Sequence, residues 1–258
     1  MDYKAISYLQ ADGLAVITLN RPEKMNALNS LMRAEITHAV KRAGTGARAV
    51  VITGTGKAFC SGQDLADANS AAEIDLERTL RDEYIPMVGA IQTCPVPVIA
   101  AVNGPAAGAG ASLALAADVC IASEGAYFTQ AFSRIGLIPD AGSTWFLPRQ
   151  MGMAKAMGAA LFADKISAQQ ASDWGMIWEV VPEAEFDQYW RARAAHLAKG
   201  PTQAYAAIKT ALKASQTNTL MAQLSAEAHL QGECGKSRDF MEGVTAFMEK
   251  RPARFEGR

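Results

Sequence analysis

Three short apolar runs in the first half of the chain constrain its fold more than any other feature. They cover residues 48–53, 97–102 and 118–122 and are rich in valine, isoleucine and alanine. Short apolar runs with glycines close by are typical of strands that are buried on both faces of a parallel sheet. Because helical or glycine-rich sequence separates each run from the next, the pattern predicts strand–helix–strand units, and therefore an α/β fold.

Local signals around these runs predict the neighbouring elements. Alternating apolar residues before and after Gly13 predict two strands joined by a turn. Asn29 or Ser30 can cap the helix that follows. Residues 75–93 have the apolar spacing of a long helix, which Pro86 should kink or divide.

The character of the chain changes after the first two thirds. A short helix is expected to begin at Ser167, one more apolar run follows at 176–181, and nearly all of the sequence beyond Glu183 has helical spacing. We therefore predict an α/β core over residues 1–182 and a helical C-terminal region over residues 183–258. The helical region must bury its apolar stripes against another surface, such as a neighbouring subunit.

Composition and charge exclude several classes of partner. The formal net charge of −1 provides no field that would gather nucleic acid or an anionic membrane. No apolar run reaches the roughly 18–20 residues that span a bilayer, and the N-terminus lacks the layout of a signal peptide. The four cysteines lack CxxC spacing and the three histidines lack ligand spacing. We therefore expect reduced thiols, no metal site and a cytoplasmic protein.

Two loops of small residues follow predicted strands, where backbone N–H groups can come close to a ligand. The first covers residues 58–65, and the second covers residues 102–112 and opens a helix rich in alanine. Two near matches to phosphate-binding motifs are incomplete: residues 54–57 lack the first glycine of the P-loop, and residues 108–113 lack the third glycine of the dinucleotide fingerprint. Small residues are also expected where a helix packs closely against a sheet, and the spacing alone leaves both interpretations open.

A third segment, residues 132–149, holds a single acidic residue within an apolar stretch. Asp140 lies between Pro139 and Ala141. Desolvation can raise the pKa of a carboxyl group in such surroundings, which suits a general base. The alternative, which the spacing favours at least as much, is that Asp140 caps a helix starting near Ser143.

Together these segments resemble those of the crotonase superfamily, the enoyl-CoA hydratase/isomerase family. The resemblance includes residues 19–28 near the start and 240–251 near the end, so that five motifs occur in the family's order along the whole chain. It implies a crotonase-like spiral of ββα units with a helical C-terminal trimerisation region. It also implies an acyl-CoA substrate, no separate cofactor because coenzyme A is part of that substrate, and a homotrimer or a dimer of trimers.

The resemblance also assigns roles to particular residues. In this family two backbone N–H groups, one from each small-residue loop, hold the thioester carbonyl oxygen, and the matching residues here are Ser61 and Ala109. Fixed N–H donors stabilise the enolate charge that develops on that oxygen. The family's coenzyme A path implies binding residues in the loops and near the C-terminus, the latter reaching the site from an adjacent subunit. These are Ser61, Gly62, Gln63, Asp64, Ala109, Phe247 and Lys250.

One departure from the family pattern bears on the reaction. Hydratases of this family use two glutamates, and the residues at those positions here are Ser112 and Phe132, neither of which is a carboxylic acid. Asp140 falls where the family's isomerases carry a catalytic aspartate. A lone base beside an oxyanion hole suits proton removal at one carbon and return at another, without addition of water. The resemblance therefore implies an acyl-CoA isomerase in which Asp140 is the base and acid.

Two further segments, residues 136–149 and 171–178, resemble most closely the isomerases of phenylacetate catabolism. These convert ring 1,2-epoxyphenylacetyl-CoA to its oxepin thioester, and their relatives shift double bonds in enoyl-CoA chains. We expect Phe132, Trp145 and Tyr84 to line an apolar cavity that suits a planar ring.

Other interpretations stay open at this point. The chain could be a hydratase-like member, or a dehalogenase-like member that uses an aspartate as nucleophile, although the latter also needs an early histidine and only His38 is available. A non-catalytic CoA-binding protein is a third possibility. Asp140 argues against it, because a decaying site need not keep a carboxylate at the isomerase position.

Overall fold

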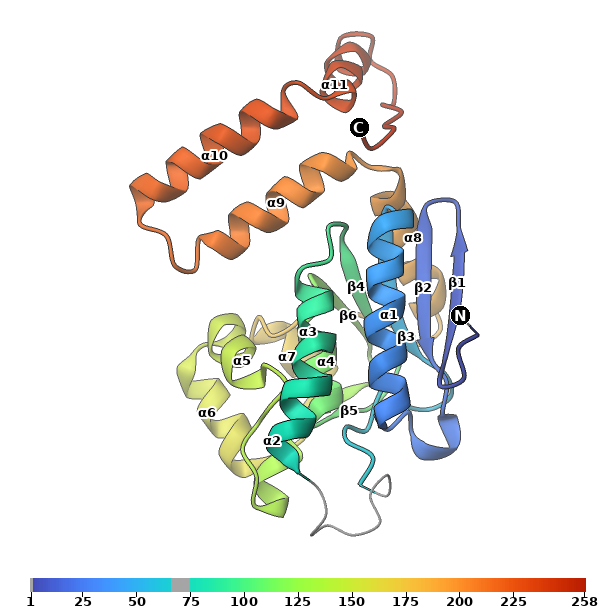
Figure 1. The fold of residues 1–258 in the computed structure, drawn as a ribbon, viewed down its shortest axis with the longest axis vertical. Coiled ribbons are helices and arrows are strands. Elements are labelled where there is room, and N and C mark those ends of the chain that lie inside the picture. Colours follow the sequence, from blue (N-terminus) through green and yellow to red (C-terminus); the bar gives the residue numbers. More distant parts are fainter. Residues whose placement is uncertain (1, 66–74) are drawn as a thin grey trace.

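The computed structural model describes residues 2–65 and 75–258, which are built around a six-stranded sheet (Figure 1). Its strand order is β1-β2-β3-β4-β6-β9, with β1 and β2 antiparallel and the other neighbouring pairs parallel. A second, small sheet has the order β5-β7-β8. The strands are β1 (Ile6–Ala11), β2 (Leu14–Leu19), β3 (Ala49–Gly54), β4 (Val98–Val102), β5 (Ala106–Ala107), β6 (Val119–Ser123), β7 (Tyr127–Thr129), β8 (Ile166–Ser167) and β9 (Glu179–Val181).

The three apolar runs form β3, β4 and β6 in the middle of the large sheet, which confirms the predicted strand–helix–strand pattern. These strands are mostly apolar because helices cover both faces of the sheet. Val50 packs in the core cluster on the side of α1 (Ser30–Gly46). Val51 packs in the cluster on the opposite side, against Trp190 of α8 (Phe186–Lys199).

Two helices start where the sequence predicted them. The first of the two candidate caps, Asn29, is the one used, and its side chain accepts a hydrogen bond from the Met32 N–H at 2.9 Å. Ser167 caps α7 (Ala168–Asp173) through a reciprocal capping box with Gln170. Both predictions are confirmed, because a cap depends only on residues within one turn of the helix start.

The helix predicted over residues 75–93 is divided, as Pro86 indicated. The chain passes from α2 (Leu76–Thr79) through a π-helical turn, η3 (Leu80–Tyr84), into α3 (Ile85–Gln92). Pro86 lies in the first turn of α3, where its missing N–H would have no partner within the helix. The widened turn therefore ends one helix and starts the next without breaking the path of the chain.

The C-terminal helices fall into two groups. α8 belongs with the core, since Trp190 is only 2% exposed against the sheet. The next three helices project from one end of the molecule (Figure 1), and neither α9 nor α10 has a buried residue. The predicted region 183–258 thus begins with a core helix, and only the helices after it extend away from the sheet. These are α9 (Thr202–Ala214), α10 (Leu220–Cys234) and α11 (Arg238–Met248).

The remaining helices are η1 (Pro22–Lys24), α4 (Ala109–Leu115), η4 (Ala131–Ile135), α5 (Ser143–Met151) and α6 (Met153–Phe162). Across the described ranges, none of the helices combines the length and the hydropathy that crossing a bilayer would require. Among the same residues, no group of three or more His, Cys, Asp and Glu side chains is placed to hold a metal ion.

Candidate active site

The three segments singled out in the sequence meet around one cavity of about 300 Å³. The loop after β3, the start of α4, η4 and the turn before α5 all contribute to its wall, together with α2 and η3. The polar lining residues are Ser61, Gln63, Thr79, Tyr84, Arg134 and Asp140. The other lining residues are Gly62, Leu65, Leu76, Leu80, Gly108, Ala109, Ala131, Phe132, Ile135 and Leu137.

The two small-residue loops pack directly against each other beyond the carboxyl ends of β3 and β4. The Cys60 N–H donates to the Pro105 carbonyl at 3.1 Å, and the Ala107 N–H donates to the Cys60 carbonyl at 2.9 Å. A Cβ atom on Gly110 would lie 2.2 Å from the Cys60 carbonyl oxygen, so only glycine fits there. Both interpretations of these residues therefore hold, because close packing is what brings the two loops to one cavity.

The backbone donors that face the cavity differ from the prediction in one position. The Ser61 N–H donates to the Met25 carbonyl at 3.0 Å, which contradicts its predicted role as a free donor. The Gln63 N–H in the same loop makes no hydrogen bond within the described residues, and Gln63 lines the cavity. Ala109 is the first residue of α4, so its N–H lacks a helical partner, as the prediction requires. A Cβ atom on Gly62 would lie 3.5 Å from the Ala109 nitrogen, so the two donor segments are adjacent.

Asp140 lines the cavity at the turn that precedes α5. Its Oδ1 atom is buried and has no hydrogen-bond partner among the described residues. This burial raises the pKa of Asp140 from 3.8 to about 6. The helix-cap interpretation is wrong, because Gly142 occupies the N-cap position of α5 and no side chain caps that helix. Asp140 contributes only its backbone carbonyl, which accepts a hydrogen bond from the Ser143 N–H at 2.9 Å.

The two positions where relatives carry glutamates have different surroundings. Phe132 lines the cavity with its ring, whereas Ser112 is fully buried behind Asp140. The Ser112 hydroxyl lies 3.0 Å from the Asp140 carbonyl oxygen and 2.7 Å from the hydroxyl of Ser143. Of the described residues that line the cavity, Asp140 is therefore the one carboxylic acid.

A hydrogen-bonded group forms one polar wall of the cavity. Gln63 Oε1 accepts hydrogen bonds from the Tyr84 hydroxyl and from Arg33 Nη1, the latter at 3.0 Å. The Arg33 guanidinium lies 4.9 Å from the centre of the Tyr84 ring and pairs with Glu83 at 2.7 Å. Burial raises the pKa of the Tyr84 hydroxyl, which therefore stays protonated at neutral pH.

The aromatic lining was predicted correctly for two of three residues. Tyr84 and Phe132 line the cavity, but Trp145 does not. Trp145 is 44% exposed and lines a separate cavity of about 420 Å³ together with Arg149, whose guanidinium lies 4.2 Å from the indole centre. The spacing between Asp140 and Trp145 could not show this, because α5 begins at Ser143 and turns the indole away.

The residues expected along the coenzyme A path are only partly brought together. Ser61, Gly62 and Gln63 line the cavity, whereas the Asp64 carboxylate is buried in an ion pair with Arg21 at 2.8 Å.

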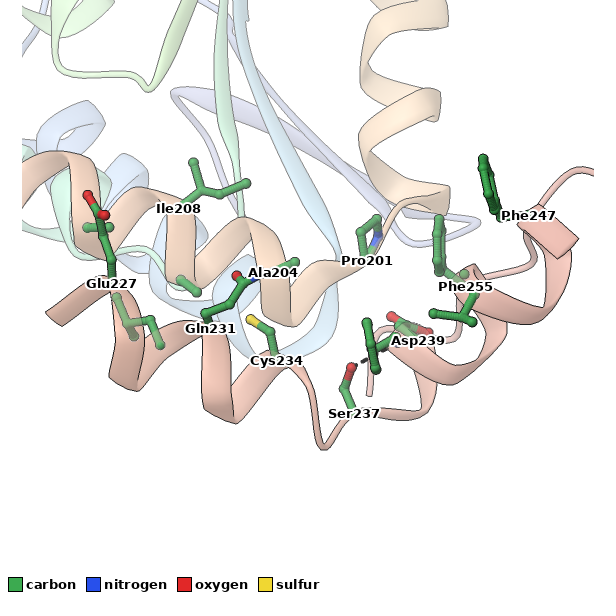
Figure 2. Close-up of a pocket in the computed structure, with 16 residues that line it drawn as sticks. Pro201, Ala204, Ile208, Glu227, Gln231, Cys234, Ser237, Asp239, Phe247 and Phe255 are labelled. Carbon is green, nitrogen blue, oxygen red and sulfur yellow. Dashed lines mark hydrogen bonds between the residues drawn. The ribbon is translucent and has the colours of Figure 1, made fainter. Parts of the chain in front are cut away.

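Phe247, in α11, and Lys250, just after it, were also expected on that path. α11 lies at the opposite end of the molecule from α2 (Figure 1). Phe247 lines an apolar groove of about 560 Å³ between α9, α10 and α11, together with Pro201 and Phe255 (Figure 2). Within a single chain neither residue lines the cavity around Asp140, so their predicted role depends on another subunit.

Comparisons with known proteins agree with this architecture. Residues 10–258 match the family model described as enoyl-CoA hydratase/isomerase. A "Probable enoyl-CoA hydratase" of Rhodobacter capsulatus is 62% identical over 258 residues, with all of both chains covered. The 1,2-epoxyphenylacetyl-CoA isomerase of Escherichia coli is 45% identical over 251 residues, with 95% of this chain and 96% of the other covered. The crystal structure of an enoyl-CoA hydratase from Polaromonas superimposes with a TM-score of 0.92 at 33% identity and covers 98% of this chain and 100% of the other.

Proposed function

We propose that this chain, which belongs to the enoyl-CoA hydratase/isomerase family, is an acyl-CoA isomerase. Its fold is the crotonase fold that the sequence predicted. Asp140 acts as its base and acid. Coenzyme A enters as part of the substrate, and no separate cofactor takes part. The enolate oxygen is held by the N–H groups of Gln63 and Ala109.

The observation that carries this proposal is the unpaired carboxylate in the cavity. Asp140 has a buried Oδ1 atom without a partner and a pKa raised to about 6. A base is most effective when its pKa lies near the working pH, since it is then largely ionised and still a strong proton acceptor. No second carboxylic acid occurs among the described lining residues to orient a water molecule for addition.

The chemistry follows from this arrangement. The thioester carbonyl lies against the two N–H donors, and Asp140 removes a proton from a carbon of the acyl group. The electrons move through the conjugated system to the thioester oxygen, where the N–H groups stabilise the charge without reorganising. Protonated Asp140 then returns the proton to a different carbon, so that the product has the same mass as the substrate. Losing one such N–H donor typically costs about 2.7–4 kcal/mol of barrier.

The lining of the cavity supports a proposal for the kind of acyl group. Phe132, Tyr84 and several aliphatic side chains surround the space near Asp140, which suits a planar apolar group. The relative from Escherichia coli is named for 1,2-epoxyphenylacetyl-CoA. We therefore assign conversion of the epoxide thioester to the oxepin thioester, double-bond migration in enoyl-CoA chains, or both.

Hydration is the competing function, and the name of the Rhodobacter capsulatus relative favours it. The two reactions differ in mass balance. Purified protein is incubated separately with a 3-enoyl-CoA, with crotonyl-CoA and with the epoxide thioester. The masses of the products are then measured by mass spectrometry. Isomerisation changes the absorbance without changing the mass. Hydration of crotonyl-CoA at a rate comparable with that of isomerisation would contradict the proposal.

A further inference from the structure

We infer that Ser112 and Ser143 are positioning residues that hold Asp140 at a constant distance from the Ala109 N–H donor. This inference rests on the proposed function of Asp140. The two serines belong to different helices, α4 and α5, and both are fully buried. Neither lines the cavity, so neither is placed to contact the substrate directly.

The direction of the hydrogen bonds in this cluster follows from the available protons. The Asp140 carbonyl can only accept, and it lies 3.0 Å from the Ser112 hydroxyl. Ser112 has one hydroxyl proton, and the competing Gly108 carbonyl is more distant, at 3.3 Å. Ser143 therefore donates to Ser112, and Ser112 donates to Asp140. The two hydroxyls act in series on one carbonyl.

The hydrogen bond from Ser112 to the Asp140 carbonyl stabilises an unfavourable turn that follows Asp140. Ala141 has φ of 48° and Gly142 has φ of 92°, so two successive residues adopt left-handed backbone. This region is unfavourable for alanine, and such residues persist only where the surroundings enforce them. The Asp140 carbonyl closes the turn by accepting the Ser143 N–H, and the Ser112 hydroxyl is its second donor. The side-chain carboxyl group of Asp140 is not held in the same way, because its Oδ1 atom has no hydrogen-bond partner among the described residues.

The position of Ser112 within α4 links the base to the oxyanion donor. Ala109 begins α4 and presents its N–H to the cavity, and Ser112 lies three residues later in the same helix. The hydrogen bond from Ser112 thus attaches the Asp140 backbone to the element that carries the donor. A base and an oxyanion hole must keep a constant separation, since a displacement of about 1 Å can cost 10²-fold in rate.

The test compares Ser112→Ala, Ser143→Ala, the double variant and Asp140→Asn, using one 3-enoyl-CoA substrate. We expect each serine variant to lower kcat by about 10- to 100-fold, with KM changed less than about twofold. Because the hydroxyls act in series, the double variant should be no worse than the single ones. The acidic limb of the pH profile of kcat/KM should move towards the ordinary aspartate value, since a loosened carboxyl group meets more water. The other ionisable groups that line the cavity with Asp140, Tyr84 and Arg134, are unchanged in these variants, as are Arg33 and Cys60 near Tyr84.

Ser133→Ala is the control, because Ser133 lies on the neighbouring η4 segment and its hydroxyl donates a hydrogen bond to the Leu161 carbonyl of α6. It should leave kcat and the pH profile unchanged. Serine variants with wild-type kcat and an unmoved acidic limb, beside an inactive Asp140→Asn, would overturn the inference and leave the proposed function standing. Losses that multiply in the double variant, or that follow a lowered melting temperature, would indicate separate packing roles and also overturn it. An active Asp140→Asn would instead remove the proposed function, and the inference with it.

Discussion

The Asp140 carboxyl group has a raised pKa because one of its oxygens is buried without a hydrogen-bond partner among the described residues. Other buried charged groups among the described residues have ionic or hydrogen-bonding partners, and buried Glu35, for example, accepts hydrogen bonds from backbone N–H groups. Asp64 pairs with Arg21, and Arg33 pairs with Glu83. A charge that is left unpaired in an otherwise well-paired structure indicates a functional site, where stability is given up for reactivity.

Replacement of Asp140 by asparagine should separate binding from turnover. The substitution keeps the size of the side chain and removes its ability to accept a proton. We expect KM for CoA thioesters to stay close to the wild-type value and kcat to fall by at least about 10²-fold. Steady-state kinetics on a 3-enoyl-CoA measure both. Near wild-type turnover in this variant would contradict the assignment of the base.

The wild-type pH profile should report the same carboxyl group. Asp140 accepts a proton only when it is ionised, so kcat/KM should decrease as the pH falls through about 6, the value to which burial raises the pKa. An ordinary aspartate would place this limb near pH 4. Measurements of kcat/KM between about pH 4.5 and 8 distinguish the two cases, and a limb at the ordinary value would argue against a desolvated base.

The raised pKa also has a consequence for stability. Because the folded pKa lies above the unfolded value, ionised Asp140 destabilises the folded state fully above about pH 6, and this effect vanishes as the pH falls below about 4. Asp140→Asn should therefore raise the melting temperature at pH 8 and have little effect near pH 4. Asp64→Asn is the matched control, and it should lower the melting temperature at pH 8 because it leaves Arg21 without its partner.

At the scale of elements, the cavity depends on how closely two loops and one helix approach each other. Gly110 in α4 meets the Cys60 carbonyl at a distance that excludes any side chain. The π-helical turn before Pro86 brings Tyr84 to the cavity wall, where its hydroxyl holds Gln63. These elements are short, and they derive their positions from contacts with each other rather than from intrinsic propensity.

Gly110→Ala should disrupt this approach. A Cβ atom 2.2 Å from the Cys60 carbonyl must push the two loops apart, which typically costs about 1–3 kcal/mol and displaces the Ala109 donor. We expect a lower melting temperature together with a lower kcat. Gly158→Ala in α6 is the matched control, because a Cβ there would meet nothing within 4 Å. That change should be neutral or stabilising by up to about 1 kcal/mol, since alanine favours a helix over glycine. Equal effects of the two substitutions would contradict the packing argument.

For the whole molecule, the notable feature is the apolar surface of the projecting helices. Several large apolar side chains of α9, α10 and α11 are exposed in the single chain, and they include Ile208, Leu212, Leu220, Leu224, Phe240, Val244 and Phe247. The groove between these helices adds to this surface (Figure 2). Soluble monomers rarely expose contiguous apolar patches larger than a few hundred Å². A closed oligomer is the usual way to cover such a surface.

Light scattering at low micromolar concentration should therefore report a multiple of three subunits, the assembly implied by the family resemblance. Burial of the projecting helices between subunits would account for their exposed apolar residues. A monomer that still turns over CoA thioesters would contradict this expectation.

Lys250 tests whether subunits share a site. If its ammonium group meets a coenzyme A phosphate from another subunit, Lys250→Ala should raise KM for CoA thioesters several-fold and leave kcat unchanged. Lys41→Ala, an exposed lysine of α1, is the matched control and should change neither parameter. Unchanged KM in Lys250→Ala would remove the lysine from the binding site.

The sequence by itself determined the elements of this protein. The β-branched runs became β3, β4 and β6, Asn29 and Ser167 became caps, and Pro86 divided its helix. These outcomes depend on interactions between neighbouring residues or on burial that any α/β sheet provides. The position of Asp140 between apolar residues was likewise a usable signal for a base, because desolvation follows from apolar surroundings.

Only the tertiary structure decided which groups face the cavity. The Ser61 N–H is taken by Met25, Trp145 turns towards another cavity, and the Ser112 hydroxyl meets Asp140. Each of these depends on the direction of a bond rather than on the type of a residue. The partners are 36 residues apart for Ser61 and Met25 and 28 residues apart for Ser112 and Asp140. Such directions are set by how loops and helices pack across the sheet, and no periodicity or capping rule within a short segment encodes them.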